Sequence, residues 1–84
     1  MGNLPPIDYA ALVECVRELT VRDPIGAGQE QVTWAAEPDV IRRYLRVSPY
    51  ATIRQTQRAL QTAVQRGLIV GSSDSGYIPK EAAR

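Results

Sequence analysis

The hydrophobic period of the chain changes at Gly67, and this change most narrows what the chain can fold into. Before Gly67, apolar side chains recur three and four residues apart, which is the period of an amphipathic helix. After Gly67, two short apolar strings, LIVG and YIP, flank SSDSG, which is rich in turn-forming residues. We therefore expect helices followed by a β-hairpin with strands at 68–71 and 77–79, and an α+β fold.

Three helices are expected before the hairpin, at 7–22, 38–46 and 52–66. Asp8 suits the start of the first, and Pro24 lies just beyond its end. Pro38 opens the second, and Thr52 is the N-cap of the third, with Gly67 at its C-terminal end. In the third helix, Ile53, Leu60 and Val64 are predicted to face the core. Across the whole chain the predicted core consists of Leu12, Val16, Leu45, Leu60, Val64 and Ile69.

The segment between the first two helices carries few signals of regular structure. DPIGAGQEQ (23–31) contains a proline and two glycines and is predicted to be a loop, and QVTW (31–34) a very short strand. Trp34, Tyr44 and Tyr77 are interpreted as core or core-edge residues, and Tyr50 as packing over the core. Residues 1–84 are too few for more than one domain, and we expect residues 1–5 and 80–84 to fray.

Charge is distributed unevenly along the chain. The net charge is +1, yet residues 1–41 hold seven acidic and two basic side chains, while residues 42–84 hold eight basic and two acidic ones. Six arginines lie between positions 42 and 66 with no acidic residue between them. This asymmetry indicates an anionic partner, of which nucleic acid is the usual one.

The chain lacks the residues that most catalytic and metal sites need. It has no histidine, so sites built on a histidine base or ligand are excluded, and with Cys15 as the sole cysteine neither a zinc site nor an internal disulfide is expected. Cys15 is interpreted as a small buried residue. We expect no metal, no cofactor and no enzymatic activity. No apolar run is long enough to span a membrane and MGNLPP lacks the features of a signal peptide, so we expect a cytoplasmic protein.

The order helix, short strand, helix, turn, helix, strand, serine- and glycine-rich loop, strand resembles the winged helix-turn-helix family. The string TIRQTQRALQTAVQRGLIV is similar to that family's third helix and first wing strand. The resemblance implies a winged helix-turn-helix domain over residues 1–84, with three helices and a small β-wing of two or three strands. It also implies that the third helix enters the major groove of double-stranded DNA.

Seven residues are the predicted DNA-binding site. On the third helix they comprise the cap and three exposed positions: Thr52, Arg54, Gln55 and Arg58. Arginine can pair bidentately with guanine and glutamine with adenine. On the second helix, Arg42, Arg43 and Arg46 would hold phosphates. The alternatives are a solvated arginine face and pairing of the second-helix arginines with the acidic first half. The wing carries Asp74 and no basic residue, so we expect its role to be mainly structural.

These features predict a small transcriptional regulator or a DNA-associated accessory factor. Two alternatives remain open: a winged-helix module that docks another protein, as a homodimer or with a different partner through the first helix, and an RNA-binding domain. Salt-dependent binding to duplex DNA would separate DNA binding from protein docking.

Overall fold

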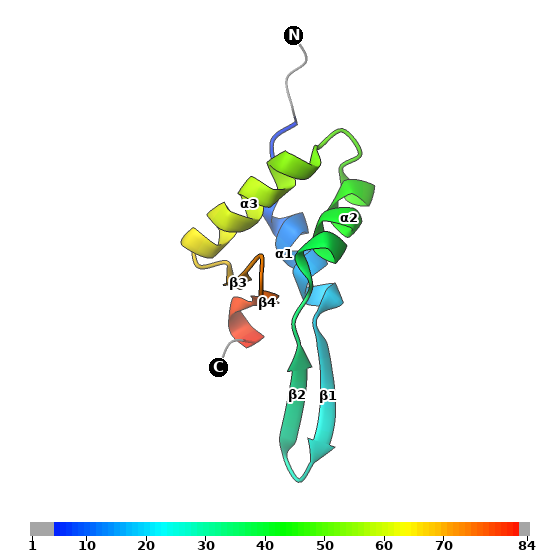
Figure 1. The fold of residues 1–84 in the computed structure, drawn as a ribbon, viewed down its shortest axis with the longest axis vertical. Coiled ribbons are helices and arrows are strands. Elements are labelled where there is room, and N and C mark those ends of the chain that lie inside the picture. The colour runs from blue at the N-terminus through cyan, green and yellow to red at the C-terminus, as the bar shows by residue number, and fades with distance from the viewer. Residues whose placement is uncertain (1–4, 83–84) are drawn as a thin grey trace.

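The computed structural model describes residues 5–82, which form an α+β fold with three α-helices and two antiparallel hairpins. The elements are α1 (Tyr9–Leu19), β1 (Val21–Gly26), β2 (Gln29–Thr33), α2 (Glu37–Val47), α3 (Ile53–Gln65), β3 (Ile69–Ser72), β4 (Gly76–Pro79) and a 3-10 helix, η1 (Lys80–Ala82). The helices and the β3–β4 hairpin gather at one end, and the β1–β2 hairpin projects from the other (Figure 1). No helix in this part of the chain is long and apolar enough to span a membrane.

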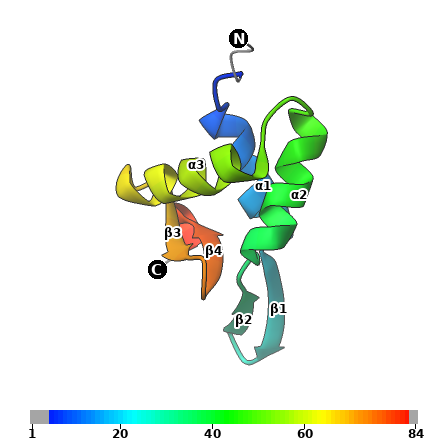
Figure 2. The same ribbon diagram turned by 45° about the horizontal axis from the view of Figure 1, so that its top comes forward.

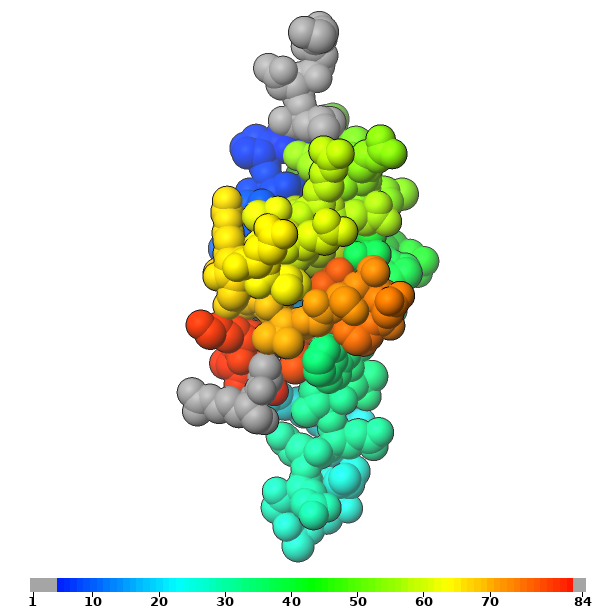
Figure 3. Space-filling model, turned by 60° about the vertical axis from the view of Figure 1, so that its left-hand side comes forward, coloured from blue at the N-terminus to red at the C-terminus, as the bar shows by residue number. Residues whose placement is uncertain are grey.

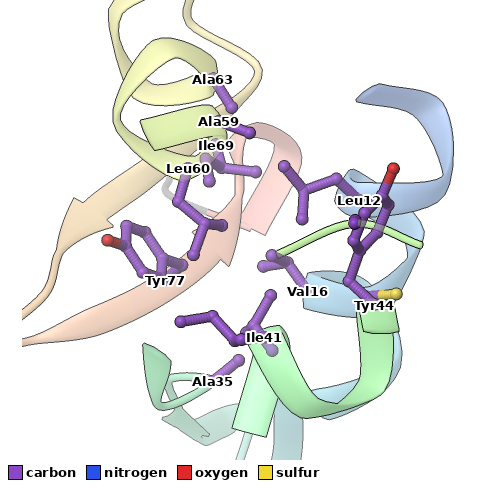
Figure 4. Close-up of a cluster of buried hydrophobic side chains, with 13 residues drawn as sticks. Leu12, Val16, Ala35, Ile41, Tyr44, Ala59, Leu60, Ala63, Ile69 and Tyr77 are labelled. Atoms are coloured by element: carbon purple, nitrogen blue, oxygen red, sulfur yellow. The ribbon is translucent and has the colours of Figure 1, made fainter. Parts of the chain in front are cut away.

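The core lies where the three helices meet the β3–β4 hairpin (Figure 4). Of the six residues predicted for it, four are almost fully buried: Leu12, Val16, Leu60 and Ile69. The other two, Leu45 and Val64, are partly buried and pack against the same cluster. Tyr44 and Tyr77 are each 1% exposed, so their prediction as core residues is confirmed, while Trp34 lies at the edge with 37% exposed.

The two ends of α3 are formed as predicted. The Thr52 hydroxyl accepts a hydrogen bond from the Gln55 backbone N–H at 3.0 Å, and the Gln55 side chain accepts one from the Thr52 N–H, which together make a capping box. At the other end Gly67 has a φ of 73°, the left-handed conformation that glycine adopts most easily. Local sequence therefore sets both ends of this helix.

The predicted core face of α3 is wrong in its rotation about the helix axis. Ile53 was expected inside, yet it is 58% exposed, and Val64 is only partly buried. The buried face instead carries Thr56, Ala59, Leu60 and Ala63. Small side chains bring this face close to its neighbours, and they carry a weak hydrophobic signal in the sequence.

The segment after α1 is a hairpin and not the predicted loop. Helix α1 ends at Leu19 instead of residue 22, because Thr20 is extended and β1 begins at Val21. Strands β1 and β2 pair from Val21–Thr33 to Gly26–Gln29, with a bulge after Pro24. Proline is excluded from central strands but tolerated on an edge, and both strands of this hairpin are edges. The predicted strand at 31–34 is the end of β2.

The β3–β4 hairpin is joined to the chain between β2 and α2. Ala35 and Tyr77 exchange two backbone hydrogen bonds of 2.8 Å in an isolated antiparallel bridge. The Tyr77 hydroxyl donates to Glu37 Oε1 at 2.9 Å, which ties β4 to α2. Gly76 is required here, because a Cβ at that position would lie 2.7 Å from the Ala35 carbonyl oxygen and its φ is +84°. These contacts hold the hairpin against the helices.

Three other expectations concern the chain ends and Tyr50. Of the residues expected to fray, 1–4 and 83–84 lie outside the described residues. Lys80–Ala82 form η1, in which Glu81 accepts hydrogen bonds from the Arg17 guanidinium at 2.5 and 2.9 Å. The Pro5 carbonyl accepts a hydrogen bond from Gln55 Nε2 at 2.5 Å. Tyr50 does not pack over the core: it is 84% exposed, since the turn between α2 and α3 carries it outward.

Candidate nucleic-acid interface

The exposed side of α3 is a row of long polar and basic side chains, which we call the α3 face: Arg54, Gln57, Arg58, Gln61 and Gln65. Arg54 and Arg58 lie one turn apart, opposite the buried residues of the same helix. Neither arginine forms an ion pair with a residue among 5–82. Figure 3 shows α3, yellow-green to yellow, crossing one side of the molecule above the orange β3–β4 turn. This face can present two full positive charges together.

The other two predicted contact residues of the third helix have partners within the fold. Thr52 uses its hydroxyl in the capping box. Gln55 is half-buried, and its amide donates to the Pro5 carbonyl. The structure therefore places Gln55 on the flank of α3 that meets the N-terminal segment, apart from the α3 face.

The three α2 arginines differ in their ion-pair partners. Arg43 Nη1 lies 2.5 Å from Glu18 Oε2 of α1, in a pair that is about half exposed. Arg42 lies 3.8 Å from Asp39 on its own helix. Arg46 has no ion pair within the described residues. Pairing with the acidic first half of the chain is thus realised for Arg43, and Arg46 keeps its charge fully available.

A groove between α2 and α3 joins Arg42 to the α3 face. It has a volume of about 300 Å³; Ile41, Leu45 and Ile53 give it apolar walls, and Arg42 and Gln57 line it as well. Arg43 and Arg46 lie with Leu19 beside a second hollow of about 170 Å³ that Arg42 also borders. The seven predicted residues therefore do not form one site: Arg42 lines this groove, Arg43 and Arg46 border the second hollow, Arg54 and Arg58 lie on the α3 face, and Thr52 and Gln55 bond within the fold.

The β3–β4 hairpin borders the other side of α3. A hollow of about 310 Å³ lies between Gln61 and Gln65 of α3 and Ser72 and Ser73 of the hairpin. The turn is closed by its own serines, because the Ser75 N–H donates to Ser72 Oγ at 3.2 Å and the Ser72 N–H to Ser75 Oγ at 3.1 Å. The turn therefore lies close beside the α3 face.

Two residues of this surface were not selected from the sequence. Gln57 and Ile53 both line the groove, and both are exposed. The predicted core face of this helix was defined by Ile53, Leu60 and Val64. That choice places Ile53 inside and Gln57 near the core side. The run of small residues at Thr56, Ala59 and Ala63 is the signal that would have rotated this core face.

Several of the other charged groups have structural partners. Asp8 caps α1 by accepting from the Ala11 N–H at 3.1 Å, and Glu14 pairs with Arg17. Hydrogen bonding from Arg17 lowers the pKa of the Glu81 carboxyl, and Glu81 in turn raises the pKa of Arg17. Burial, followed by the charge of Glu18, raises the pKa of the Cys15 thiol, so Cys15 is a poorly nucleophilic core residue as predicted. Among residues 5–82 no acidic or cysteine side chains cluster in a way that could hold a metal ion.

Comparisons of the chain with protein-family models, with curated proteins and with solved structures found no match. The functional interpretation therefore depends on the geometry and charge of the surface around α3.

Proposed function

We propose that this chain is a winged helix-turn-helix protein that binds double-stranded DNA through the α3 face. The main support for this proposal is that Arg54 and Arg58 lie one turn apart on an exposed helix face, without an acidic partner among the described residues. The order of the three helices and the β3–β4 hairpin, and the Ala35–Tyr77 bridge that adds a third short segment to that hairpin, support this proposal, while the β1–β2 hairpin replaces the single short strand expected between α1 and α2. The role that follows is a small regulator or an accessory factor on DNA.

In the proposed complex, the N-terminal half of α3 lies in the major groove. Arg54 and Arg58 pair with guanine edges, and Gln57 and Gln61 reach adenine edges. Arg46, whose charge is fully available, and Arg42 hold the phosphate backbone. Arg43 contributes less, because its ion pair with Glu18 must be weakened before it can bind a phosphate.

A salt titration tests DNA binding directly. If four to six phosphates are neutralised, log K should fall against log salt with a slope of about −4 to −5. Fluorescence anisotropy with a random duplex across a range of salt concentrations measures this slope. No binding at low salt, or a slope near zero, would contradict the proposal.

A matched pair of variants locates the surface. Replacing Arg54 or Arg58 by Ala should weaken binding to a selected site by about 1–3 kcal/mol and relax the preference at particular base pairs. Arg22→Ala removes the same charge from the exposed β1 strand, remote from α3 in Figures 1 and 2, and should leave affinity nearly unchanged. Equal losses in all three variants would mean that only net charge matters and that α3 reads no bases.

Ile53 extends the proposed readout to thymine. An exposed apolar side chain beside Arg54 suits the thymine methyl group, which adds an apolar contact in the major groove. Replacing the contacted thymine by uracil should cost about 0.8 kcal/mol, the contribution of one buried methyl-sized group. Ile53→Ser should bind the two duplexes equally well. A thymine preference that survives in Ile53→Ser would remove Ile53 from the interface.

A further inference from the structure

The β1–β2 hairpin is the part of the described chain that the rest of the fold leaves uncovered. Every β1 side chain is exposed, and in β2 only Val32 is partly covered. Both views show the hairpin projecting away from the helices (Figures 1 and 2). Two-stranded hairpins are at best marginally stable alone in water. The outer edges of this one also carry backbone N–H and C=O groups that can pair with another strand.

The two edges of the hairpin differ in their capacity to pair. Strand β1 contains Pro24, which has no N–H, and a bulge lies between Pro24 and Gly26. Proline and bulges are the devices that keep edge strands from pairing. Strand β2, with the sequence QEQVT, contains neither proline nor bulge. The edge of β2 is therefore the one open to another strand.

Strand β2 also has a self-complementary register. In an antiparallel pair of two β2 strands centred on Gln31, Glu30 lies opposite Val32 of the second copy and Gln29 lies opposite Thr33. No like charges lie directly opposite each other, and the two Glu30 carboxylates are exposed diagonal neighbours roughly 7–8 Å apart. A register centred on Glu30 would instead place two carboxylates opposite each other, and a parallel in-register pair would align them side by side.

The centred register also satisfies the backbone and the remaining charges. Pro24 lies opposite Glu30 in the hairpin. Proline has no N–H to donate to the partner strand, so this position fits one at which the backbone groups of both residues point away from the hairpin. The backbone groups of Glu30, and of Val32 two residues further on, therefore point to the open edge of β2. Arg22 pairs with Val32 and so shares a sheet face with it and with Glu30. In the joined sheet, Arg22 of the second copy then lies on the same face as Glu30, two strands away in the same row, which is roughly 10 Å between backbones and within reach of two long side chains.

We propose that two copies of this chain associate by antiparallel pairing of their β2 strands, which joins the two hairpins into a four-stranded sheet. The helix α1 surface is less suited to this role, since Glu14 and Glu18 are already paired with Arg17 and Arg43. A single pair of five-residue strands makes a small interface, so the dimer should be weak and reversible. The proposal does not depend on DNA binding.

Sedimentation velocity of the full chain over about 10 µM to 1 mM measures the association. The mass of the wild type should rise from 9.3 kDa toward that of a dimer. Val32→Pro removes an outward N–H from β2 and should raise the dissociation constant at least about tenfold. Arg22→Pro makes the same change in the same cross-strand pair but on the β1 edge, and it should associate as well as Arg22→Ala, which loses the same charge but keeps its N–H. A monomeric wild type at 1 mM, or equal behaviour of the two proline variants, would overturn the proposal.

Two charge-reversal variants, measured alone and mixed, test the β2 pairing even if a proline variant no longer forms the hairpin. Glu30→Lys alone places an ammonium group near Arg22 of the second copy, and Arg22→Glu alone places a second carboxylate near Glu30. Each variant should therefore associate less than the wild type. Mixed together, the two variants present only opposite charges across the β2 pair, and they should associate about fivefold more tightly than either alone. A mixture no tighter than its components would overturn the β2 pairing.

Discussion

The two hairpins of this chain have similar pairing but opposite surroundings. All four residues of β4 are buried, whereas every residue of β1 is exposed. The β4 strand carries Tyr77 and Ile78 on its two faces, and it packs against α1 and bonds to Ala35. The β1 strand carries Arg22, Asp23 and Pro24, which favour water or an edge. Hairpin pairing alone therefore does not determine burial; apolar side chains on both faces do.

The largest expected effect is on the free energy of unfolding, which a substitution in the β3–β4 hairpin should lower much more than one in the β1–β2 hairpin. Tyr77→Ala empties a site that is 1% exposed and removes the bond to Glu37, so it should lower the free energy of unfolding by about 3–5 kcal/mol. Val21→Ala, at a strand position that is 47% exposed, should change it by less than about 0.5 kcal/mol. Urea unfolding followed by circular dichroism measures both. Similar losses for the two variants would mean that the β1–β2 hairpin is covered in solution.

A smaller effect tests the hydroxyl that ties β4 to α2. Tyr77→Phe keeps the ring but leaves Glu37 without its donor, which should cost about 1–2 kcal/mol. Tyr50→Phe, at an 84% exposed hydroxyl, is the matched control and should be neutral. A neutral Tyr77→Phe would show that the ring alone holds β4.

The same hydroxyl predicts a pH dependence. Burial raises the pKa of Tyr77 far above its ordinary value, and the hydrogen bond to Glu37 raises it further. A group whose pKa is higher in the folded than in the unfolded state contributes its full stabilisation below the unfolded pKa, which is about 10 for tyrosine. This stabilisation is lost as the pH rises from there toward the folded pKa. The stability difference between wild type and Tyr77→Phe should therefore be constant at neutral pH and shrink in alkali. A difference that grows in alkali would contradict the assigned protonation.

The difference between the hairpins also explains how far sequence reasoning reaches. The β3–β4 hairpin, the α3 cap at Thr52 and the turn at Gly67 follow from local signals, and all three were predicted. The β1–β2 hairpin was missed because Pro24 and the glycines favour a loop, and only pairing with residues 29–33 makes them a strand. Local sequence carries no direct signal for that pairing.

The candidate site divides in the same way. Exposure of Arg54 and Arg58 follows from helical period. The rotation of α3 does not, because it depends on alanines that pack closely in three dimensions. The pairs Arg43–Glu18 and Gln55–Pro5 join residues 25 and 50 positions apart. The uneven charge raised pairing of the second-helix arginines with the first half as an alternative, but no local pattern identifies Arg43 and Glu18 as the pair or gives Gln55 a partner.

The smallest expected effect is on DNA affinity, when one aspartate in each hairpin is replaced by lysine. Asp74 is in the β3–β4 turn, next to Ser73, which borders the α3 face, and its carboxylate should repel a phosphate bound there. Asp74→Lys should tighten non-specific DNA binding by about 0.2–1 kcal/mol at low salt and steepen the salt slope by about 0.9, the contribution of one further phosphate contact. Asp23→Lys makes the same change on β1, remote from α3, and should alter neither value.

Anisotropy titrations of both variants on one random duplex give the comparison, and matched unfolding curves show whether each fold is intact. Weaker binding by Asp74→Lys would mean that Asp74 makes a specific contact. Equal tightening by both variants would mean that DNA contacts the two hairpins alike, which would end the functional distinction between them.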